Sequence, residues 1–153
     1  MVIKASTILL MLVFSTAAFP QIQLRDNGLA KEVKLYTSGN IESEGYYKNG
    51  SKSGKWTYYF ENGSKKRVEY YDLKGLPNGK WTNWYENGQK WNTVNYNKGE
   101  VHGRWTYWYR NGNKWHQLSD ANGEVNGKWT FWLENGTVND SGRYAGEDTA
   151  VKG

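Results

Sequence analysis

Cysteine is absent from this sequence, and aliphatic residues are scarce. The 153-residue chain, long enough for one domain, has no Cys and only two Pro. Disulfides, thiolate chemistry and cysteine-based metal sites are therefore excluded. Hydrophobic residues make up 37% of the chain at a mean hydropathy of −0.89, which leaves too little aliphatic surface for a large two-layer core. Another regular feature must hold the domain together.

Long hydrophobic runs are confined to the N-terminus. Residues 8–14 form an apolar stretch that follows Lys4 and is too short to span a bilayer. Residues 15–18 (Ser-Thr-Ala-Ala) supply the small side chains that a signal peptidase requires. We therefore expect a signal peptide over residues 1–18 with cleavage after Ala18. The mature protein is then secreted or periplasmic, with no integral membrane segment.

Aromatic residues and glycine are abundant instead. Nine Trp, twelve Tyr and eighteen Gly favour short strands joined by tight turns, because flat side chains suit a pleated surface and glycine supplies positive φ. The net charge is +5. The basic residues are spread along the chain, and the one cluster, 65–67, is typical of a solvated strand edge. This pattern disfavours nucleic acid as a partner.

A repeated pattern dominates the rest of the chain. Gly-Lys/Arg-Trp-Thr, followed by aromatic residues and then Asn-Gly, occurs in four copies that begin at Gly54, Gly79, Gly103 and Gly127. The spacings are 25, 24 and 24 residues. A degenerate copy, 35–39, lies 24 residues before 59–63. Self-similarity at such a period is typical of repeat architectures.

Each copy predicts a β-hairpin. A strand rich in aromatic residues and Thr precedes Asn-Gly, and a more polar strand follows, at 65–71, 90–96 and 114–119. Asn-Gly is the strongest short-range signal for a two-residue type I′ turn, in which both central residues have positive φ. The turn glycines are Gly63, Gly88, Gly112 and Gly136.

A two-residue turn predicts which residues face each other across the hairpin. It pairs Tyr85 with Lys90, Trp84 with Trp91, Thr82 with Thr93, Trp81 with Val94, Tyr109 with Lys114, Trp108 with Trp115, and Trp105 with Leu118. Such cross-strand pairs stabilise a sheet by about 0.2–1 kcal/mol each. The repeat that contains the 65–71 strand is one residue longer than the others, 25 residues against 24, so we expect a bulge or a longer loop there.

Alternation along the strands assigns the side chains to two faces. The first face contains Trp56, Tyr58, Phe60, Trp81, Tyr85, Trp105, Tyr107, Tyr109, Trp129, Phe131 and Leu133. The second face contains Thr57, Tyr59, Thr82, Trp84, Thr106, Trp108, Thr130 and Trp132. The first face is nearly continuous apolar surface, so we expect it to be the more buried. Its four tryptophans, Trp56, Trp81, Trp105 and Trp129, are then structural.

A row of aromatic residues on the second face is the candidate binding surface. It consists of Tyr59, Trp84, Trp108 and Trp132, reinforced by Trp91 and Trp115. Exposed aromatic rows mark protein interfaces or sugar-stacking platforms.

These observations predict an all-β fold. We expect an elongated, twisted antiparallel meander of repeated β-hairpins, single-layered or solenoid-like, with a repeat of about 24 residues. The repeats occupy residues 33–144, after an N-terminal lead-in at 19–32 and before a C-terminal tail at 145–153.

The repeated residues also carry a resemblance. The pattern Gly-Lys-Trp-x-x-Trp/Tyr-Tyr-Glu-Asn-Gly-Gln-Lys, preceded by residues 44–54, resembles the MORN repeat variant, which occurs in bacterial YwqK-type antitoxin-like proteins. The resemblance implies hairpin arrays that contact proteins or lipids, and the antitoxin label implies a partner toxin. Two features depart from it. One is the export signal, and the other is a Gly-x-Tyr half-motif that is clear only at 45–47 and 142–144.

Catalytic and metal-binding groups do not converge in this pattern. His102 and His116 lack a second ligand at metal-binding spacing, and we expect both to be solvated. The carboxylates of Glu61, Glu86 and Glu134 recur too regularly to form one acid–base pair. We therefore expect no enzyme and no cofactor, but an exported module that binds a protein. The alternatives are an antitoxin or immunity component and a surface that binds cell-envelope glycan.

Overall fold

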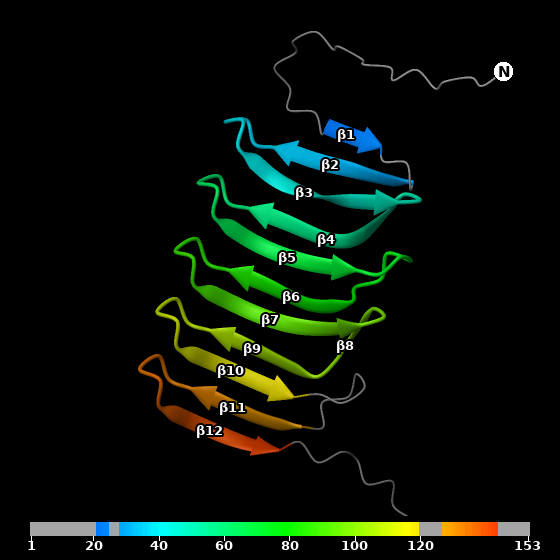
Figure 1. Ribbon diagram of the computed structural model, residues 1–153. Helices are drawn as coiled ribbons and strands as arrows, with labels where there is room; N and C mark the ends of the chain where they lie inside the picture. The colour runs from blue at the N-terminus through cyan, green and yellow to red at the C-terminus, as the bar shows by residue number, and fades with distance from the viewer. Residues whose placement is uncertain (1–20, 25–27, 120–126, 144–153) are drawn as a thin grey trace, which may run out of the picture.

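The computed structural model describes residues 21–24, 28–119 and 127–143. These residues form twelve strands in one antiparallel sheet (Figure 1), and no helix occurs among them. The strands follow one another in chain order, except that the short β8 pairs only with β7. The predicted all-β meander of hairpins is confirmed. Within the described ranges, no helix of membrane-spanning length and apolarity is present.

The strands that follow the Asn-Gly turns, β5, β7 and β10, lie within one residue of the ranges that the sequence predicts. The strands are β1 (Gln21–Leu24), β2 (Leu29–Leu35), β3 (Ile41–Lys48), β4 (Ser51–Tyr59), β5 (Lys65–Tyr71), β6 (Gly79–Trp84), β7 (Lys90–Asn97), β8 (Glu100–Val101), β9 (Arg104–Trp108), β10 (Lys114–Ser119), β11 (Lys128–Trp132) and β12 (Val138–Arg143). Strands β1 and β2 extend the sheet into the segment 19–32 that we expected to precede it. The predicted signal peptide over 1–18, its cleavage site, Tyr144 and the tail 145–153 lie outside the described residues.

The repeated hairpins share one turn, and it is not the predicted type I′ turn. The amide of Gly88 donates to the carbonyl of Tyr85 at 3.0 Å, and the amide of Tyr85 donates to that of Gln89 at 2.8 Å. Gly88 has a φ of +84°, whereas Asn87 is not among the described residues with positive φ. The loop therefore has three residues and ends on a left-handed glycine, the geometry that forms a G1 bulge. The prediction was right for the glycine and wrong for the asparagine.

The asparagine has a different role in these turns. Its side-chain oxygen accepts a hydrogen bond from the amide two residues later, as from Gln89 to Asn87 at 3.1 Å. Asn62, Asn111 and Asn135 accept the same bond. Positive φ at two successive loop residues, as a type I′ turn requires, occurs instead at Asn49-Gly50 and Lys98-Gly99.

The third loop residue shifts the register close to the turn. Thr82 pairs with Thr93 and Trp81 with Val94, as predicted. Trp84, however, pairs with Lys90, which leaves Trp91 as the extra residue of a bulge.

The same shift occurs in the other hairpins. Trp105 pairs with Leu118 as predicted, but Trp108 pairs with Lys114 and Trp115 is extra. The predicted pairs Tyr85–Lys90, Trp84–Trp91, Tyr109–Lys114 and Trp108–Trp115 are therefore wrong. The bulge predicted for β5 is present, but every hairpin of this type has one. The extra residue of that repeat enters the connection between β5 and β6.

Burial is distributed over both faces of the sheet. Trp56 is 2% exposed, but the other three tryptophans expected to be buried on the first face, Trp81, Trp105 and Trp129, are only half-buried. The continuous buried row crosses the second face through cross-strand neighbours: Thr57, Val68, Thr82, Thr93 and Thr106. Ser43, Glu69 and Asn92, which pair with residues of the first face, are buried as well, so the first face is not, as we expected, the more buried of the two.

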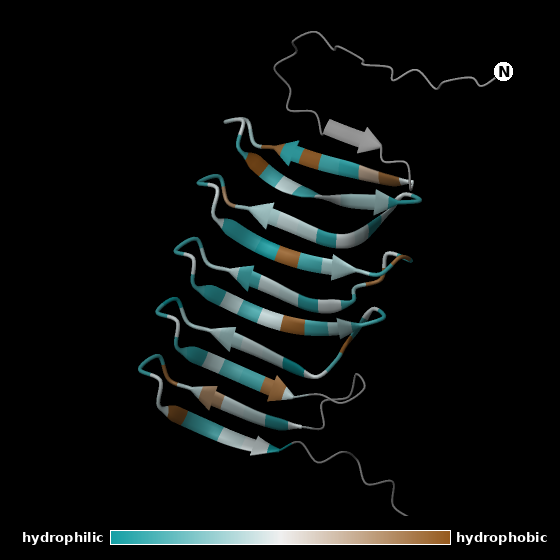
Figure 2. Ribbon diagram, viewed as in Figure 1, coloured by the Kyte–Doolittle hydropathy of each residue, from teal (hydrophilic) through white to brown (hydrophobic). Residues whose placement is uncertain are grey.

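Side-chain size explains this distribution. A single layer has no second sheet to cover its large rings, whereas a short Thr side chain is covered by the longer aromatic side chains around it. Hydropathy colouring (Figure 2) is brown only in short separate segments, so no continuous aliphatic layer exists among the described strands.

Tyrosine hydroxyls link successive repeats. Tyr85 donates to the carbonyl of Trp108 at 2.9 Å and Tyr109 to that of Trp132 at 2.9 Å. Tyr36 makes the equivalent bond to Tyr59 at 2.7 Å. Because each bond joins residues 23 positions apart, the links support the repeats through their neighbours, as in a solenoid.

Turn asparagines form a second series of links. The amide nitrogens of Asn87 and Asn111 donate to the carbonyls of Arg110 and Glu134, at 2.9 and 2.8 Å. Asn40 donates to the carbonyl of Glu61 at 2.8 Å. The hairpin turns along one edge of the sheet (Figure 1) are therefore joined side by side.

One glycine permits the burial of the largest core side chain. A Cβ atom at Gly45 would lie 2.2 Å from Trp56 Cδ2. The ring covers this glycine, meets Tyr47 edge-on at 4.9 Å between centroids, and donates its indole N–H to the carbonyl of Tyr46 at 2.9 Å. The Gly-x-Tyr half-motif at 45–47 therefore forms the site against which the Trp56 ring packs.

The substitution Gly45→Ala should therefore destabilise the fold. We expect the free energy of unfolding to fall by about 2 kcal/mol, because an added methyl group in a closed contact forces the ring to move. Urea denaturation of the single and double variants measures this effect. In a Trp56→Leu background the penalty should shrink. An unchanged penalty there would contradict the assigned contact.

Candidate functional site

The predicted aromatic row on the second face is only partly accessible. Tyr59, Trp84, Trp108 and Trp132 are all half-buried. Lysine side chains also lie over two of the rings, Lys90 over Trp108 at 5.8 Å and Lys114 over Trp132 at 5.2 Å from the centroids. These cations hold positions that a ligand stacking on the row would need.

Trp91 and Trp115 do not reinforce that row, contrary to our expectation. The bulges bring them against aromatic rings of the first face. The ring of Trp91 lies 6.4 Å from that of Tyr85, and the ring of Trp115 lies 5.9 Å from Tyr107 and 6.1 Å from Tyr109. Each tryptophan is 43% exposed. The exposed tryptophans and their tyrosine neighbours form what we call the bulge surface: Tyr85, Trp91, Tyr107, Tyr109 and Trp115.

A cleft adjoins this surface near the turn edge of the sheet. Its volume is about 610 Å³, and Tyr58, Phe60, Tyr85 and Trp91 contribute aromatic side chains to its lining. Arg67 and Asn83 also line it, and both pair along the sheet with residues of the first face. The cleft therefore combines apolar rings with polar groups, as ligand sites commonly do.

Two unpaired cations stand at the cleft. Lys66 and Arg110 are exposed and form no ion pair among the described residues. Each lies over a ring instead, Lys66 at 5.7 Å from the Phe60 centroid and Arg110 at 5.1 Å from that of Tyr85.

The carboxylates of the lining offset these charges only in part. Glu42 is ion-paired with Lys34 at 2.8 Å. Glu86 is exposed and unpaired among the described residues. The third lining cation, Arg67, is held by Glu69 at 2.9 Å. The cleft thus keeps an excess of positive charge from its two free cations.

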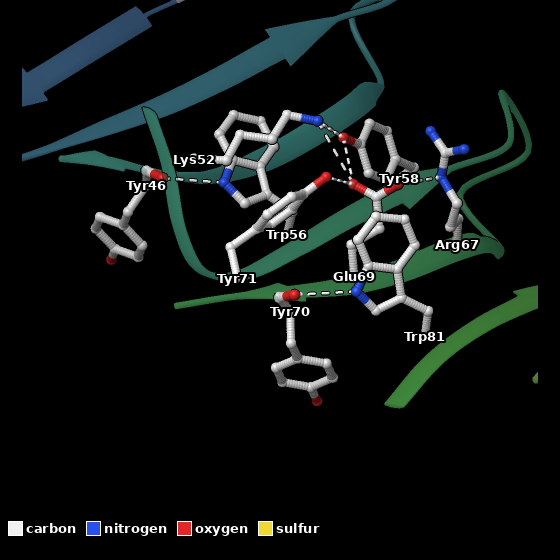
Figure 3. Close-up of polar contacts among 9 residues, drawn as sticks. All are labelled: Tyr46, Lys52, Trp56, Tyr58, Arg67, Glu69, Tyr70, Tyr71 and Trp81. Atoms are coloured by element: carbon white, nitrogen blue, oxygen red, sulfur yellow. Dashed lines mark hydrogen bonds and ion pairs between the residues drawn. The ribbon is translucent and has the colours of Figure 1, made fainter. Parts of the chain in front are cut away.

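Glu69 is the centre of a buried polar cluster behind the cleft (Figure 3). It is 3% exposed, and its Oε2 accepts hydrogen bonds from Tyr58 at 2.9 Å and Tyr71 at 2.8 Å. Lys52 approaches the same oxygen at 3.5 Å, and Arg67 pairs with Oε1 at 2.9 Å. A buried carboxylate with four polar partners is well compensated.

This cluster is a scaffold for the cleft. When the repeats are aligned, Glu69 stands at the position that Gly45 holds in the preceding repeat, 24 residues earlier. Its ion pair with Arg67 keeps that guanidinium over the ring of Tyr58, at 4.4 Å. The pKa values of Tyr58 and Tyr71 are raised above the ordinary value of 10.0. Burial is the largest cause, and the hydrogen bond from each hydroxyl to Glu69 is the second.

The two histidines differ from each other. His102 is exposed, as predicted. His116 is half-buried rather than solvated, because its ring stacks on Phe131 at 3.9 Å and on Tyr107 at 6.2 Å. Burial lowers the pKa of His116 below the ordinary histidine value of 6.5. No group of three or more potential metal ligands occurs in the part of the chain that the structure describes.

Sequence reasoning missed both the cleft and the Glu69 cluster. An alignment of the repeats shows two departures from the pattern that could have pointed to them. Phe60 stands in a column that holds a tyrosine in the other repeats that another repeat follows, and Leu133 in the last one. Glu69 is the one charged residue in the column of the half-motif glycine, which otherwise holds Gly or an aliphatic residue. Both departures fall in the same repeat. Together these features describe a surface suited to binding.

The comparisons with known proteins agree with the repeat. The sequence profile of the MORN repeat variant matches residues 30–49, 52–72, 77–98 and 101–119. No curated protein matches the chain. The matched segments end and begin close to the loops opposite the turn edge, so each contains one hairpin turn.

The Glu69 cluster predicts a loss of stability in alkaline solution. Because the folded pKa values of Tyr58 and Tyr71 are raised, their contribution to stability is complete below about pH 10, the unfolded value, and is lost as the pH rises above it. Unfolding measured between neutral pH and pH 11 should show a steeper decline for the wild type than for Tyr58→Phe. Glu69→Gln should flatten the decline while keeping both phenols. Parallel profiles for all three proteins would contradict the assignment.

Proposed function

The chain belongs to the MORN repeat variant family, and on that premise we propose that it is an exported, non-enzymatic module that binds a protein partner. MORN repeats are generally modules that bind proteins or lipids. The observation that carries the proposal for this chain is the bulge surface. It presents two exposed tryptophans, Trp91 and Trp115, from equivalent bulges on one face.

The chemistry of the bulge surface favours a protein partner. Trp and Tyr are the residues most enriched at the energetic centres of protein interfaces. Tyr85 and Tyr109 are held in place by hydrogen bonds to the next repeat. Rigid neighbours reduce the conformational entropy that binding must remove.

Capture of a partner from a cell-envelope extract tests this proposal. The wild-type chain should retain a protein that the Trp91→Ala/Trp115→Ala double variant binds several hundred-fold more weakly, because truncation of central tryptophans costs about 2 kcal/mol each and about 1.4 kcal/mol is tenfold in affinity. The matched control is Leu73→Ala, which removes an exposed apolar side chain from the opposite loop edge. Equal retention by all three chains would refute the bulge surface as the interface.

Export is the second part of the proposal. The apolar stretch at 8–14 and the small residues at 15–18 support it. Expression in a host with a Sec pathway should give a mature chain that begins at Phe19, as measured by mass spectrometry of the secreted or periplasmic fraction. Recovery of the intact 153-residue chain from the cytoplasm alone would contradict export.

Two narrower alternatives concern the partner. A toxin fits the antitoxin resemblance, provided that the toxin is itself exported. A cell-envelope glycan is the other, because exposed aromatic rings such as Trp91 can stack on sugars. Polysaccharide retention that depends on Trp91 and Trp115 would favour the glycan over a protein.

A further inference from the structure

The links between neighbouring repeats fail at one junction. Phe60 occupies the position at which Tyr36, Tyr85 and Tyr109 donate a hydroxyl to the following repeat. A phenylalanine has no hydroxyl, so the carbonyl of Trp84 receives no such bond.

The asparagine link is also missing at this junction. Asn62 accepts the turn bond from Ser64 at 2.9 Å. Its amide nitrogen makes no hydrogen bond within the described part of the chain, although the equivalent nitrogens of Asn87 and Asn111 donate to the next turn. Two independent links are thus absent between the same two turns.

The cleft lies at this junction. Phe60 belongs to the turn on one side, and Tyr85 and Glu86 belong to the turn on the other. The carbonyl of Trp84, whose counterparts accept a hydroxyl in other repeats, therefore has an acceptor position that an incoming N–H group can use. The missing links leave both the space and a polar contact for a ligand.

The charges at the cleft select the kind of ligand. The two cations without a carboxylate partner, Lys66 and Arg110, flank aromatic rings of the lining. The chain as a whole carries +5. Carboxylates separated by an apolar side chain would match this pattern of cations and rings.

We propose that the cleft binds an extended acidic segment of the protein partner, with carboxylates at Lys66 and Arg110 and an apolar side chain against Phe60 and Trp91. A backbone N–H of the segment donates to the Trp84 carbonyl. This assignment rests on the proposed function, since it specifies where and by what chemistry the partner is held.

Fluorescence anisotropy with the mature chain tests this assignment. The probe is a labelled peptide in which glutamates flank a single phenylalanine, and its comparators carry glutamine or lysine in place of each glutamate. The acidic peptide should bind most tightly, and its affinity should fall as ionic strength rises. Equal affinity for the acidic and glutamine peptides, or no binding of either, would overturn the proposal.

Charge variants locate the site. Lys66→Gln and Arg110→Gln should each weaken acidic-peptide binding about threefold, as expected for a partly exposed ion pair. Glu86→Gln is the matched control of opposite sign and should strengthen binding slightly. Binding that is unaffected by both cation variants would place the peptide elsewhere and refute the cleft.

The variant Phe60→Tyr tests the junction itself. It should restore the hydroxyl link to Trp84, raise the midpoint of thermal unfolding and weaken peptide binding, because the ligand loses an acceptor. Asn111→Ser is its counterpart at a junction outside the cleft, because it removes the amide donor to the Glu134 carbonyl, and it should lower the midpoint without changing peptide affinity. Unchanged peptide affinity in Phe60→Tyr would contradict the role of the junction.

Failure of this inference differs from failure of the proposed function. If the partner is captured through Trp91 and Trp115 but the acidic peptide does not bind, only the cleft assignment fails. Binding of oligogalacturonate or of phosphatidylglycerol vesicles in place of the peptide would also overturn the assignment. Loss of partner capture altogether would reject the proposed function.

Discussion

A single-layered sheet must be held together along its length, and this constraint governs the rest of the molecule. No second layer covers the described strands, so each hairpin gains its stability from the hairpins on either side. Tyr85 and Asn87 show how this is achieved, because both bond to main-chain carbonyls of the next repeat. The aromatic composition and the absence of cysteine have the same explanation. Large rings span the spacing between strands, and links repeated along the sheet replace a covalent staple.

The same constraint makes a departure from the repeat informative. When Phe60 replaces the linking tyrosine, the two turns beside it lose a contact that no second layer can replace. Glu69, in the same repeat, places a buried carboxylate in the column of the half-motif glycine and assembles Lys52 and Arg67 around it. This repeat thus has a buried charged cluster and lacks both links at its turn. Regular repeats build the scaffold, whereas an irregular one provides a distinct surface.

Much of the fold could be predicted because β-strands alternate with a period of two residues. The alternation correctly paired Thr82 with Thr93 and Trp81 with Val94, far from the turns. The turn type could not be predicted in the same way. Asn-Gly suits either a two-residue loop with positive φ at both positions or a three-residue loop that ends on the glycine. The loops differ by one residue, and that residue decides the side on which Trp91 and Trp115 lie. The candidate surface was therefore assigned to the wrong face for these two residues.

The sequence by itself determined the repeat, the hairpins, the strand positions and the glycines with positive φ, since all of these depend on residues close together in the chain. The tertiary structure alone decided which rings are buried, where the bulges direct Trp91 and Trp115, and where the cleft lies. Those properties depend on contacts between residues about one repeat apart, such as Tyr109 with Trp132. In a single layer, the size of a side chain's neighbours on adjacent strands determines its exposure. A hydrophobic pattern read along one strand does not contain that information.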